Sequence, residues 1–270
     1  MTRLTPYDWH QRFSQQARWT ASLRNYLYAR AGLENAQRVL EVGCGTGALL
    51  DELIRKPSLR PSVIIDRSGQ INIRPDLAVH GLDLDQGYLS LARRHAPTAL
   101  LVQGDAHHLP YSEASFDLLF CHFLLLWVRE ANQVIAEMTR LLRPGGSLLA
   151  LAEPDYGGRI DYPPELAEIG RQQEESLRRQ GADTRLGRRL KSLFTQAGLQ
   201  DVEVGVLGSQ WQGAPSQAEL QLEWTVLEND LGDYIDSNEL ERLQAIDAQA
   251  WERGERVLFV PTFYARGKRT

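Results

Sequence analysis

The residues best suited to chemistry lie in one short stretch, Val39 to Gly47, which reads VLEVGCGTG. Apolar residues lead into three alternating glycines, a pattern that predicts a buried strand turning sharply into a helix. Glycine permits the positive φ that such a turn needs, and it lets a ligand approach the backbone. The first amides of the following helix would then face that ligand. The stretch therefore predicts a cofactor site at a strand–turn–helix junction.

Glu41, two residues before the first glycine, limits which cofactor fits. Residues 43–48 (GCGTGA) match the dinucleotide pattern G-x-G-x-x-G/A. However, a carboxylate at the mouth of the turn repels a diphosphate, because like charges close together in a partly buried site are costly. The same carboxylate suits a ligand that carries an ammonium and a sulfonium. The electrostatics therefore favour S-adenosylmethionine (SAM) over NAD.

The composition is that of an ordinary globular protein, with 270 residues, 43% hydrophobic and 24% charged. A net charge of −5 disfavours a nucleic-acid-binding protein, which usually carries a basic face. No apolar run is long enough to span a membrane, and the first residues lack the apolar core of a signal peptide. The two cysteines, Cys44 and Cys121, form neither a disulfide framework nor a zinc cluster. We expect a cytoplasmic protein.

The hydrophobic pattern predicts strands that alternate with helices, the order of an open α/β sheet. The predicted strands are 38–42, 78–82, 99–103, 115–121, 147–152, 201–210 and 256–265. The predicted helices are 6–31, 48–55, 86–95, 129–142, 164–179, 188–197, 216–231 and 237–252. Within residues 57–79, two apolar runs flank Asp66–Gly69, which predicts an inserted β-hairpin of unassigned role.

A second acid stands at the end of the predicted strand 78–82, in the sequence HGLDLD. Asp83 is placed to accept hydrogen bonds from both hydroxyls of a ribose, as acids at this strand end do in nucleoside-binding α/β folds. Asp85 competes with it for this role.

These motifs resemble those of the class I SAM-dependent methyltransferases of the small-molecule type. The likeness rests on the acid before the GxGxG run, on Asp105 after the third strand, on FDLL at 116–119 and on LRPGG at 142–146. Ordered motifs cover roughly residues 36–155, and residues 186–265 follow the family by pattern only. The Asn/Asp-Pro-Pro-aromatic motif of the family's DNA- and protein-methylating enzymes does not follow the fourth strand.

The resemblance implies a Rossmann-like, seven-stranded, mostly parallel sheet with helices on both faces and SAM at the carboxyl ends of the strands. In the family, the aspartate after the third strand receives the adenine amine, and the backbone amide of the next residue meets a ring nitrogen. Carried over to this sequence, the predicted cofactor-binding residues are Glu41, Gly43, Cys44, Gly45, Gly47, Asp83, Leu84, Asp105, Ala106 and Cys121.

We expect a single methyltransferase domain over residues 1–270, because no repeat or flexible linker divides the chain. Its predicted parts are an N-terminal helical arm (1–35), a SAM-binding core (36–155) with the hairpin insertion (57–79), a helical lid (156–198 and 215–253), and edge strands (199–212 and 255–268). In the arm, Tyr7, Trp19 and Arg24 are candidates to close over the cofactor, with core packing as the alternative.

The candidate catalytic residues are His122, Glu153 and Tyr156, which follow the fourth and fifth strands. Each has a structural alternative, and for Glu153 this is a hydrogen bond to backbone. The adjacent pair His107–His108 is not expected to bind a metal, because neighbouring side chains rarely point at one ion.

The sequence thus predicts an enzyme that transfers a methyl group from SAM to a small-molecule acceptor by in-line displacement. The alternatives are a non-catalytic SAM-binding module, an RNA or protein methyltransferase, and an NAD-dependent dehydrogenase, which lacks an evident Tyr-x-x-x-Lys set. The acceptor and the oligomeric state stay open.

Overall fold

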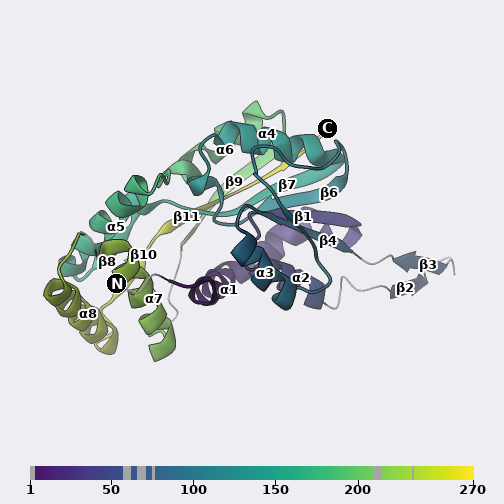
Figure 1. Ribbon diagram of the computed structural model, residues 1–270. Helices are drawn as coiled ribbons and strands as arrows, with labels where there is room; N and C mark the ends of the chain where they lie inside the picture. Colours follow the sequence, from purple (N-terminus) through teal and green to yellow (C-terminus); the bar gives the residue numbers. More distant parts are fainter. Residues whose placement is uncertain (1–3, 57–61, 66–70, 75–76, 209–213, 233) are drawn as a thin grey trace.

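The computed structural model describes residues 4–56, 62–65, 71–74, 77–208, 214–232 and 234–270. A seven-stranded sheet forms its centre (Figure 1), in the order β5-β4-β1-β6-β7-β11-β9. All pairs from β5 to β7 are parallel, whereas β11 runs antiparallel to both of its neighbours. This confirms the predicted mostly parallel sheet. The strands are β1 (Arg38–Val42), β4 (Ala78–Asp83), β5 (Leu100–Gln103), β6 (Phe116–Cys121), β7 (Leu142–Pro154), β9 (Gln200–Gly208) and β11 (Pro261–Lys268).

Helices cover both faces of the sheet (Figure 1). On one face lie α4 (Ala131–Leu141) and α6 (Leu190–Gln196), and on the other lie α1 (Pro6–Arg30), α2 (Ala48–Arg55) and α3 (Gln86–His95). Each face has its own apolar core, one around Phe116, Met138 and Phe194, the other around Tyr28 and Phe120. Strands buried on both faces are typical of parallel sheets. None of the helices described is long and apolar enough to cross a membrane.

The turn from β1 into α2 adopts the backbone that the glycines predicted. Gly43, Gly45 and Gly47 have φ values of 74°, 50° and 80°, all in the left-handed region. The amides of Gly43 and Cys44 both donate to the carbonyl of Leu82 in β4, at 2.8 and 2.9 Å. The turn is therefore held against the neighbouring strand, at the edge where the strands end.

Replacing Gly47 with Ala should destabilise the protein through two separate effects. The positive φ costs a non-glycine residue about 1–2 kcal/mol. A Cβ at Gly47 would also lie 3.1 Å from Ala92 in α3, and such overpacking adds about 1–3 kcal/mol. Gly254→Ala is the matched control, because Gly254 has a similar φ of 66° with nothing within 4 Å of an added Cβ. Urea unfolding should therefore show the larger loss for Gly47→Ala, and equal losses would contradict this packing.

A separate group of elements lies beyond one end of the sheet (Figure 1), and we refer to this group as the lid. It consists of β8 (Ile160–Tyr162), α5 (Ala167–Arg179), α7 (Gln217–Leu231), α8 (Ser237–Glu252) and β10 (Val257–Phe259). Its helices share an apolar core that includes Ile169, Trp224 and Leu243. Beneath this core, the buried Asp161 pairs with Arg159 at 2.6 Å and with Arg256 at 2.7 Å. The lid thus has an internal framework of its own.

Two details differ from the predicted elements. The last strand, predicted as 256–265, is divided into β10, which pairs with β8, and β11, which pairs in the main sheet. The strand predicted as 147–152 is longer, because β7 begins at Leu142 and includes the LRPGG segment, with Gly145 at a φ of 82°. Because the last strand is divided before Pro261, β10 pairs within the lid and β11 pairs within the main sheet. In the insertion, β2 (Ser62–Ile65) and β3 (Ile71–Arg74) pair antiparallel, while the turn predicted at 66–69 lies outside the described residues.

Candidate functional site

A cavity of about 390 Å³ lies where the central strands end. Its floor includes Glu41 of β1, Gly43 and Gly45 of the glycine turn, and Asp83 at the end of β4. Helix α1 lines it with Trp9, Arg12, Phe13 and Gln16, and α3 lines it with Tyr88. In open α/β sheets ligands bind in this crevice. The structure therefore brings together the glycine turn and the two acids that the sequence singled out.

Glu41 is the most unusual side chain in this cavity, because it is a buried carboxylate, only 3% exposed. Its Oε2 atom is buried and has no hydrogen-bond partner among the described residues. Burial raises the pKa of Glu41 well above its ordinary value, and the nearby Arg24 offsets this only in part. A buried acceptor without a partner is costly. The cavity therefore holds an acceptor that a cationic donor would satisfy.

Asp83 lines the same cavity and is fixed by backbone amides. Its Oδ2 accepts from the Gly45 amide at 2.7 Å, and its Oδ1 accepts from the Asp85 amide at 2.9 Å. Burial raises the pKa of Asp83, and these hydrogen bonds partly offset the rise. Asp85, the competing candidate, instead caps α3 by accepting from the Tyr88 amide at 3.0 Å. Asp83 is thus the acid that faces the cavity.

Helix α1 closes one side of the cavity through ring contacts. The Phe13 ring lies so near the glycine turn that a Cβ on Gly45 would come within 3.0 Å of it, and Phe13 also meets the edge of Tyr88. The His10 ring stacks on His95 with centroids 3.7 Å apart. This differs from the predicted set of Tyr7, Trp19 and Arg24. None of these three lines the main cavity, whereas Trp9, Arg12, Phe13 and Gln16, which recur at helical spacing on α1, do.

His122 and Tyr156 line the cavity on the side away from α3. The Nε2 atom of His122 lies 2.9 Å from the Thr20 hydroxyl, and burial, with Arg24 nearby, lowers the pKa of His122 well below 6.5. The imidazole is therefore neutral at pH 7. Burial also raises the pKa of Tyr156 to about 12, so its hydroxyl keeps its proton and can donate. The two residues thus offer the cavity a neutral imidazole and a hydroxyl donor.

Glu153, a catalytic candidate in the sequence analysis, has a structural role in the folded chain. It is fully buried and does not line the cavity. Its carboxylate accepts from the amides of Leu124, Leu125 and Leu126, at 3.2, 2.9 and 3.1 Å. These bonds hold the segment after β6 in place, since three successive amides share one acceptor. The backbone alternative therefore describes Glu153 better than the catalytic one.

The burial of Glu153 should make stability depend on pH. Burial raises the pKa of Glu153 to about 7, against its backbone hydrogen bonds, whereas a glutamate in an unfolded chain titrates near 4.3. A raised folded-state pKa contributes stability below about pH 4 that is lost as the pH rises through about 7. Between pH 5 and 8 the free energy of unfolding of the wild type should therefore fall by roughly 3 kcal/mol more than that of Glu153→Gln. Urea unfolding at several pH values measures this difference, and parallel curves would contradict it.

Five predicted cofactor residues do not line the cavity: Gly47, which ends the glycine turn, and four others. Leu84 is 69% exposed, and Cys121 is completely buried in the core of the α4 face. Asp105 and Ala106 follow the neighbouring strand β5 and do not line the cavity either. The Asp105 carboxylate accepts from the His107 amide at 2.9 Å and lies 2.6 Å from its Nδ1. These hydrogen bonds keep Asp105 beside its own loop.

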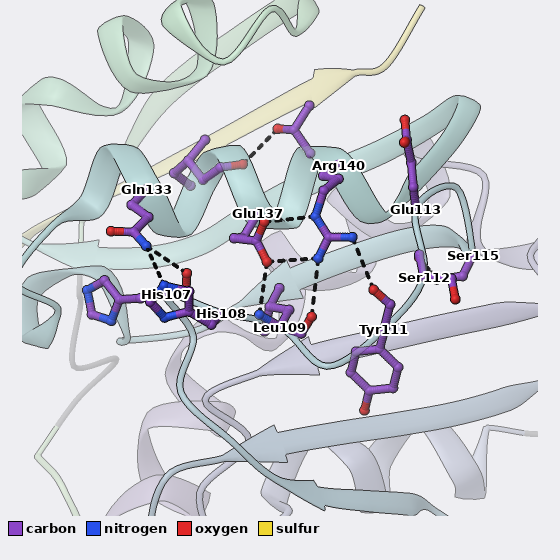
Figure 2. Close-up of polar contacts among 12 residues, drawn as sticks. His107, His108, Leu109, Tyr111, Ser112, Glu113, Ser115, Gln133, Glu137 and Arg140 are labelled. Carbon is purple, nitrogen blue, oxygen red and sulfur yellow. Dashed lines mark hydrogen bonds and ion pairs between the residues drawn. The ribbon is translucent and has the colours of Figure 1, made fainter.

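The loop after Asp105 is tied to α4, as Figure 2 shows. The Glu137 carboxylate accepts from the Leu109 amide at 2.9 Å, and Arg140 donates to the carbonyls of Leu109 and Tyr111. Gln133 contacts both the His107 carbonyl and the His108 ring. Among the residues described, no three His, Cys, Asp or Glu side chains are grouped as a metal would require. The histidine pair is thus part of a loop anchor.

Sequence reasoning missed several residues of the cavity. Tyr88 and Phe13 belong to helices whose patterns indicate only packing, and Gln173 and Asp230 come from the lid. Asp230 accepts from the Gln173 amide at 3.0 Å, and burial raises its pKa. Nothing in the local sequence marks these positions, because their approach depends on how α5 and α7 pack on the sheet. The one sequence signal lay in α1, which has more aromatic residues than packing along a single face requires.

An open, mostly parallel α/β sheet with an acid-bearing glycine turn at its carboxyl edge defines a Rossmann-like protein with a nucleoside-type cofactor site. The profile of a family described as "Methyltransferase domain" matches residues 40–150. Demethylmenaquinone methyltransferase of Renibacterium salmoninarum is 30% identical over 145 residues, which are 53% of this chain and 52% of that protein. The chain spans about half or less of the length of the curated relatives that it matches.

Two solved structures share the fold. A possible histamine N-methyltransferase from Thermotoga maritima has a TM-score of 0.52 and 16% identity, covering 97% of this chain and 94% of that one. Phosphoethanolamine N-methyltransferase 2 of Haemonchus contortus, solved with phosphomonomethylethanolamine and S-adenosylhomocysteine, has a TM-score of 0.51 and 18% identity, covering 87% of this chain and 50% of that one. With the sequence motifs, the matching profile supports a SAM-dependent methyltransferase domain over residues 40–150.

Proposed function

We propose that this chain transfers a methyl group from SAM to a small-molecule acceptor. The observation that carries the proposal is the buried carboxylate oxygen of Glu41, which has no partner in the described part of the chain and lies beside the glycine turn in the same cavity as Asp83. A cationic, amino-acid-bearing nucleoside satisfies this acceptor, whereas a diphosphate would be repelled by it.

The residues of the cavity floor fit SAM well. Glu41 takes the positive end of its amino-acid part, and Asp83 takes the ribose hydroxyls, because a carboxylate has acceptor capacity beyond two amide bonds. Gly43 and Gly45 leave the backbone open, since a Cβ on either would press on Leu124 or Phe13. We leave Gly47, Leu84, Asp105, Ala106 and Cys121 out of this set because none of them lines the cavity.

The acceptor side of the cavity supplies positioning and proton transfer. SAM, when bound, offers a methyl group on a positively charged sulfur that leaves as a neutral thioether. Tyr156 holds the acceptor by donating its hydroxyl, and neutral His122 takes the acceptor's proton as the new bond forms. Holding the two reactants in line accounts for roughly 7–11 kcal/mol of the barrier in well-oriented systems.

A small-molecule acceptor is supported by the walls of the cavity. Helix α1 and lid residues Gln173, Leu177, Val226 and Asp230 line it opposite the strand ends. A macromolecular acceptor would have to reach past both. The relative named demethylmenaquinone methyltransferase bears the name of a small molecule, which also supports this class.

The test is to incubate the purified chain with SAM that carries a deuterated methyl group and with the small-molecule fraction of a bacterial extract. Mass spectrometry should then find at least one compound that is heavier by the labelled methyl group, and this product should be absent with heat-treated protein. If SAM binds but repeated extracts give no labelled compound, the non-catalytic SAM-binding module replaces this proposal.

A further inference from the structure

A second cavity adjoins the cofactor cavity and shares part of its wall. We call it the side chamber. It shares Arg12, Gln16, Phe123, Tyr156 and Gln173 with the main cavity, and it is smaller, at about 60 Å³. Its remaining walls come from α1, from the end of β7 and from the chain around β10. A molecule in the side chamber therefore lies beside Tyr156, on the acceptor side of the site.

The charges that line the side chamber cancel one another. The Arg12 guanidinium pairs with Glu223 of α7, and their side chains are only 8% and 13% exposed. Arg159 pairs with Asp161 at 2.6 Å, and both of these side chains are almost completely buried. Arg12 and Arg159 each have a carboxylate of their own, so neither is left to attract an anion. A charged ligand entering this chamber would lose its hydration without gaining a counter-ion.

Further ion pairs and hydrogen bonds behind the chamber wall also compensate these charges. Asp161 also accepts from Arg256, and Arg256 donates to Asp247 at 2.6 Å. Arg159 donates to the side-chain oxygen (Oε1) of Gln173 at 2.6 Å, and the side-chain nitrogen (Nε2) of Gln173 donates to the Asp230 carboxylate. These bonds hold the Arg159 guanidinium in place, and the pair with Glu223 holds that of Arg12, so the two planes serve as fixed walls of the chamber.

The uncharged surface of the chamber is flat and largely apolar. Trp19, Phe123, Pro154, Leu258 and Val260 line it, and the Arg12 guanidinium lies 4.8 Å from the centre of the Trp19 ring. Aromatic rings and guanidinium planes both stack on flat, conjugated molecules. The shared wall also includes two residues with polar side-chain groups, Tyr156 with its hydroxyl and Gln16 with its amide. Within the described ranges of the chain, neither group has a hydrogen-bond partner.

We infer, on the basis of the proposed function, that the acceptor is an uncharged aromatic hydroxyl compound. One edge of its ring system enters the side chamber from the main cavity, and its hydroxyl lies toward Tyr156 and His122. The hydroxyl oxygen bonds to the methyl carbon, the carbon–sulfur bond breaks with its electron pair passing to sulfur, and the hydroxyl proton passes to His122 and then to water. Charge balances, since a sulfonium and a neutral hydroxyl compound give a thioether, a methyl ether and one proton.

The first test compares three naphthols that differ in charge: 2-naphthol, 6-hydroxy-2-naphthoate and 6-(aminomethyl)-2-naphthol. Their binding to the full chain is measured by calorimetry with S-adenosylhomocysteine at saturation. We expect 2-naphthol to bind at least about tenfold more tightly than either charged compound, because each charge must be desolvated without a partner. Equal binding of the three, or tighter binding of a charged one, overturns the inference.

The second test changes the charge of the chamber. Glu223→Gln leaves Arg12 without its carboxylate, so the affinity for the naphthoate should rise about tenfold relative to 2-naphthol. Glu228→Gln is the matched control, because Glu228 is exposed on the same helix. Should Glu223→Gln fail to fold, Arg12→Gln serves in its place and should favour the aminomethyl compound. An unchanged preference in a folded variant overturns the inference.

The two proposals fail in different ways. If S-adenosylhomocysteine does not bind to the wild type, the proposed function is wrong. If it binds and the naphthol preferences are absent, only the acceptor class is wrong.

Discussion

Glu41→Gln should weaken SAM binding by a factor of about 30 to several thousand. Truncating one partner of a buried charge pair typically costs about 2–5 kcal/mol, and each 1.4 kcal/mol is a factor of ten. Glu41 is the buried carboxylate with an unpartnered oxygen in the cofactor cavity, so its charge is the one that SAM would neutralise. Calorimetric titration of both proteins with SAM measures the loss.

The same substitution should make the free protein more stable at pH 7. Burial raises the folded-state pKa of Glu41, so its contribution to stability is greatest below about pH 4 and falls as the pH rises toward the folded pKa. A neutral amide removes this penalty. Weaker cofactor binding together with a higher melting temperature is the signature of a binding residue, whereas a structural residue would lose both.

Glu34→Gln is the control, since Glu34 is an exposed acid close to β1 in sequence. It should change neither quantity. If Glu41→Gln binds SAM as tightly as the wild type, the charge of Glu41 does not contribute to SAM binding, which contradicts the proposal.

His122→Gln should lower kcat by about 10²- to 10⁴-fold, the usual contribution of a general base, with little change in SAM affinity. Because the pKa of His122 is lowered by burial, the basic imidazole is present at neutral pH. The wild-type rate should therefore stay level through the usual titration range of histidine near 6.5 and fall only at lower pH, and the variant should lack this fall. Initial rates from pH 5 to 8 with a methylated acceptor measure both effects.

His108→Gln serves as the control, because His108 is exposed and lies on the loop tied to α4. It should keep the wild-type rate and pH profile. Nearly full activity in His122→Gln would show that His122 is not the general base. Catalysis would then depend on Tyr156 and on the alignment of the two reactants.

The parts of the fold that depend on neighbouring residues could be predicted from the sequence. Thr5 and Pro6 mark the start of α1, where the Thr5 hydroxyl does cap the helix, and the three glycines mark the turn into α2. Parallel strands buried on both faces have continuous apolar runs that stand out in the sequence. Asp83 could be singled out for the same local reason, because it ends such a run.

The parts that depend on distant segments could not be predicted. Val257 of β10 pairs with Tyr162 of β8, although the sequence predicts residues 255–268 as an edge strand of the sheet and only residues 156–198 and 215–253 as the lid. Glu153 resembled a catalytic acid because it ends a central strand, yet its carboxylate is used by the amides of residues 124–126. The Arg12–Glu223 pair joins two helices that are far apart in the sequence, so the neutral side chamber exists only in the folded chain.

The most direct measurement for the central claim is the calorimetric titration of the wild-type chain with SAM and, separately, with NAD. A cavity whose buried Glu41 carboxylate has an unpartnered oxygen should bind SAM at least about a hundredfold more tightly, since a cation offsets the cost of that charge and a diphosphate increases it. Tight binding of NAD without binding of SAM would contradict the account.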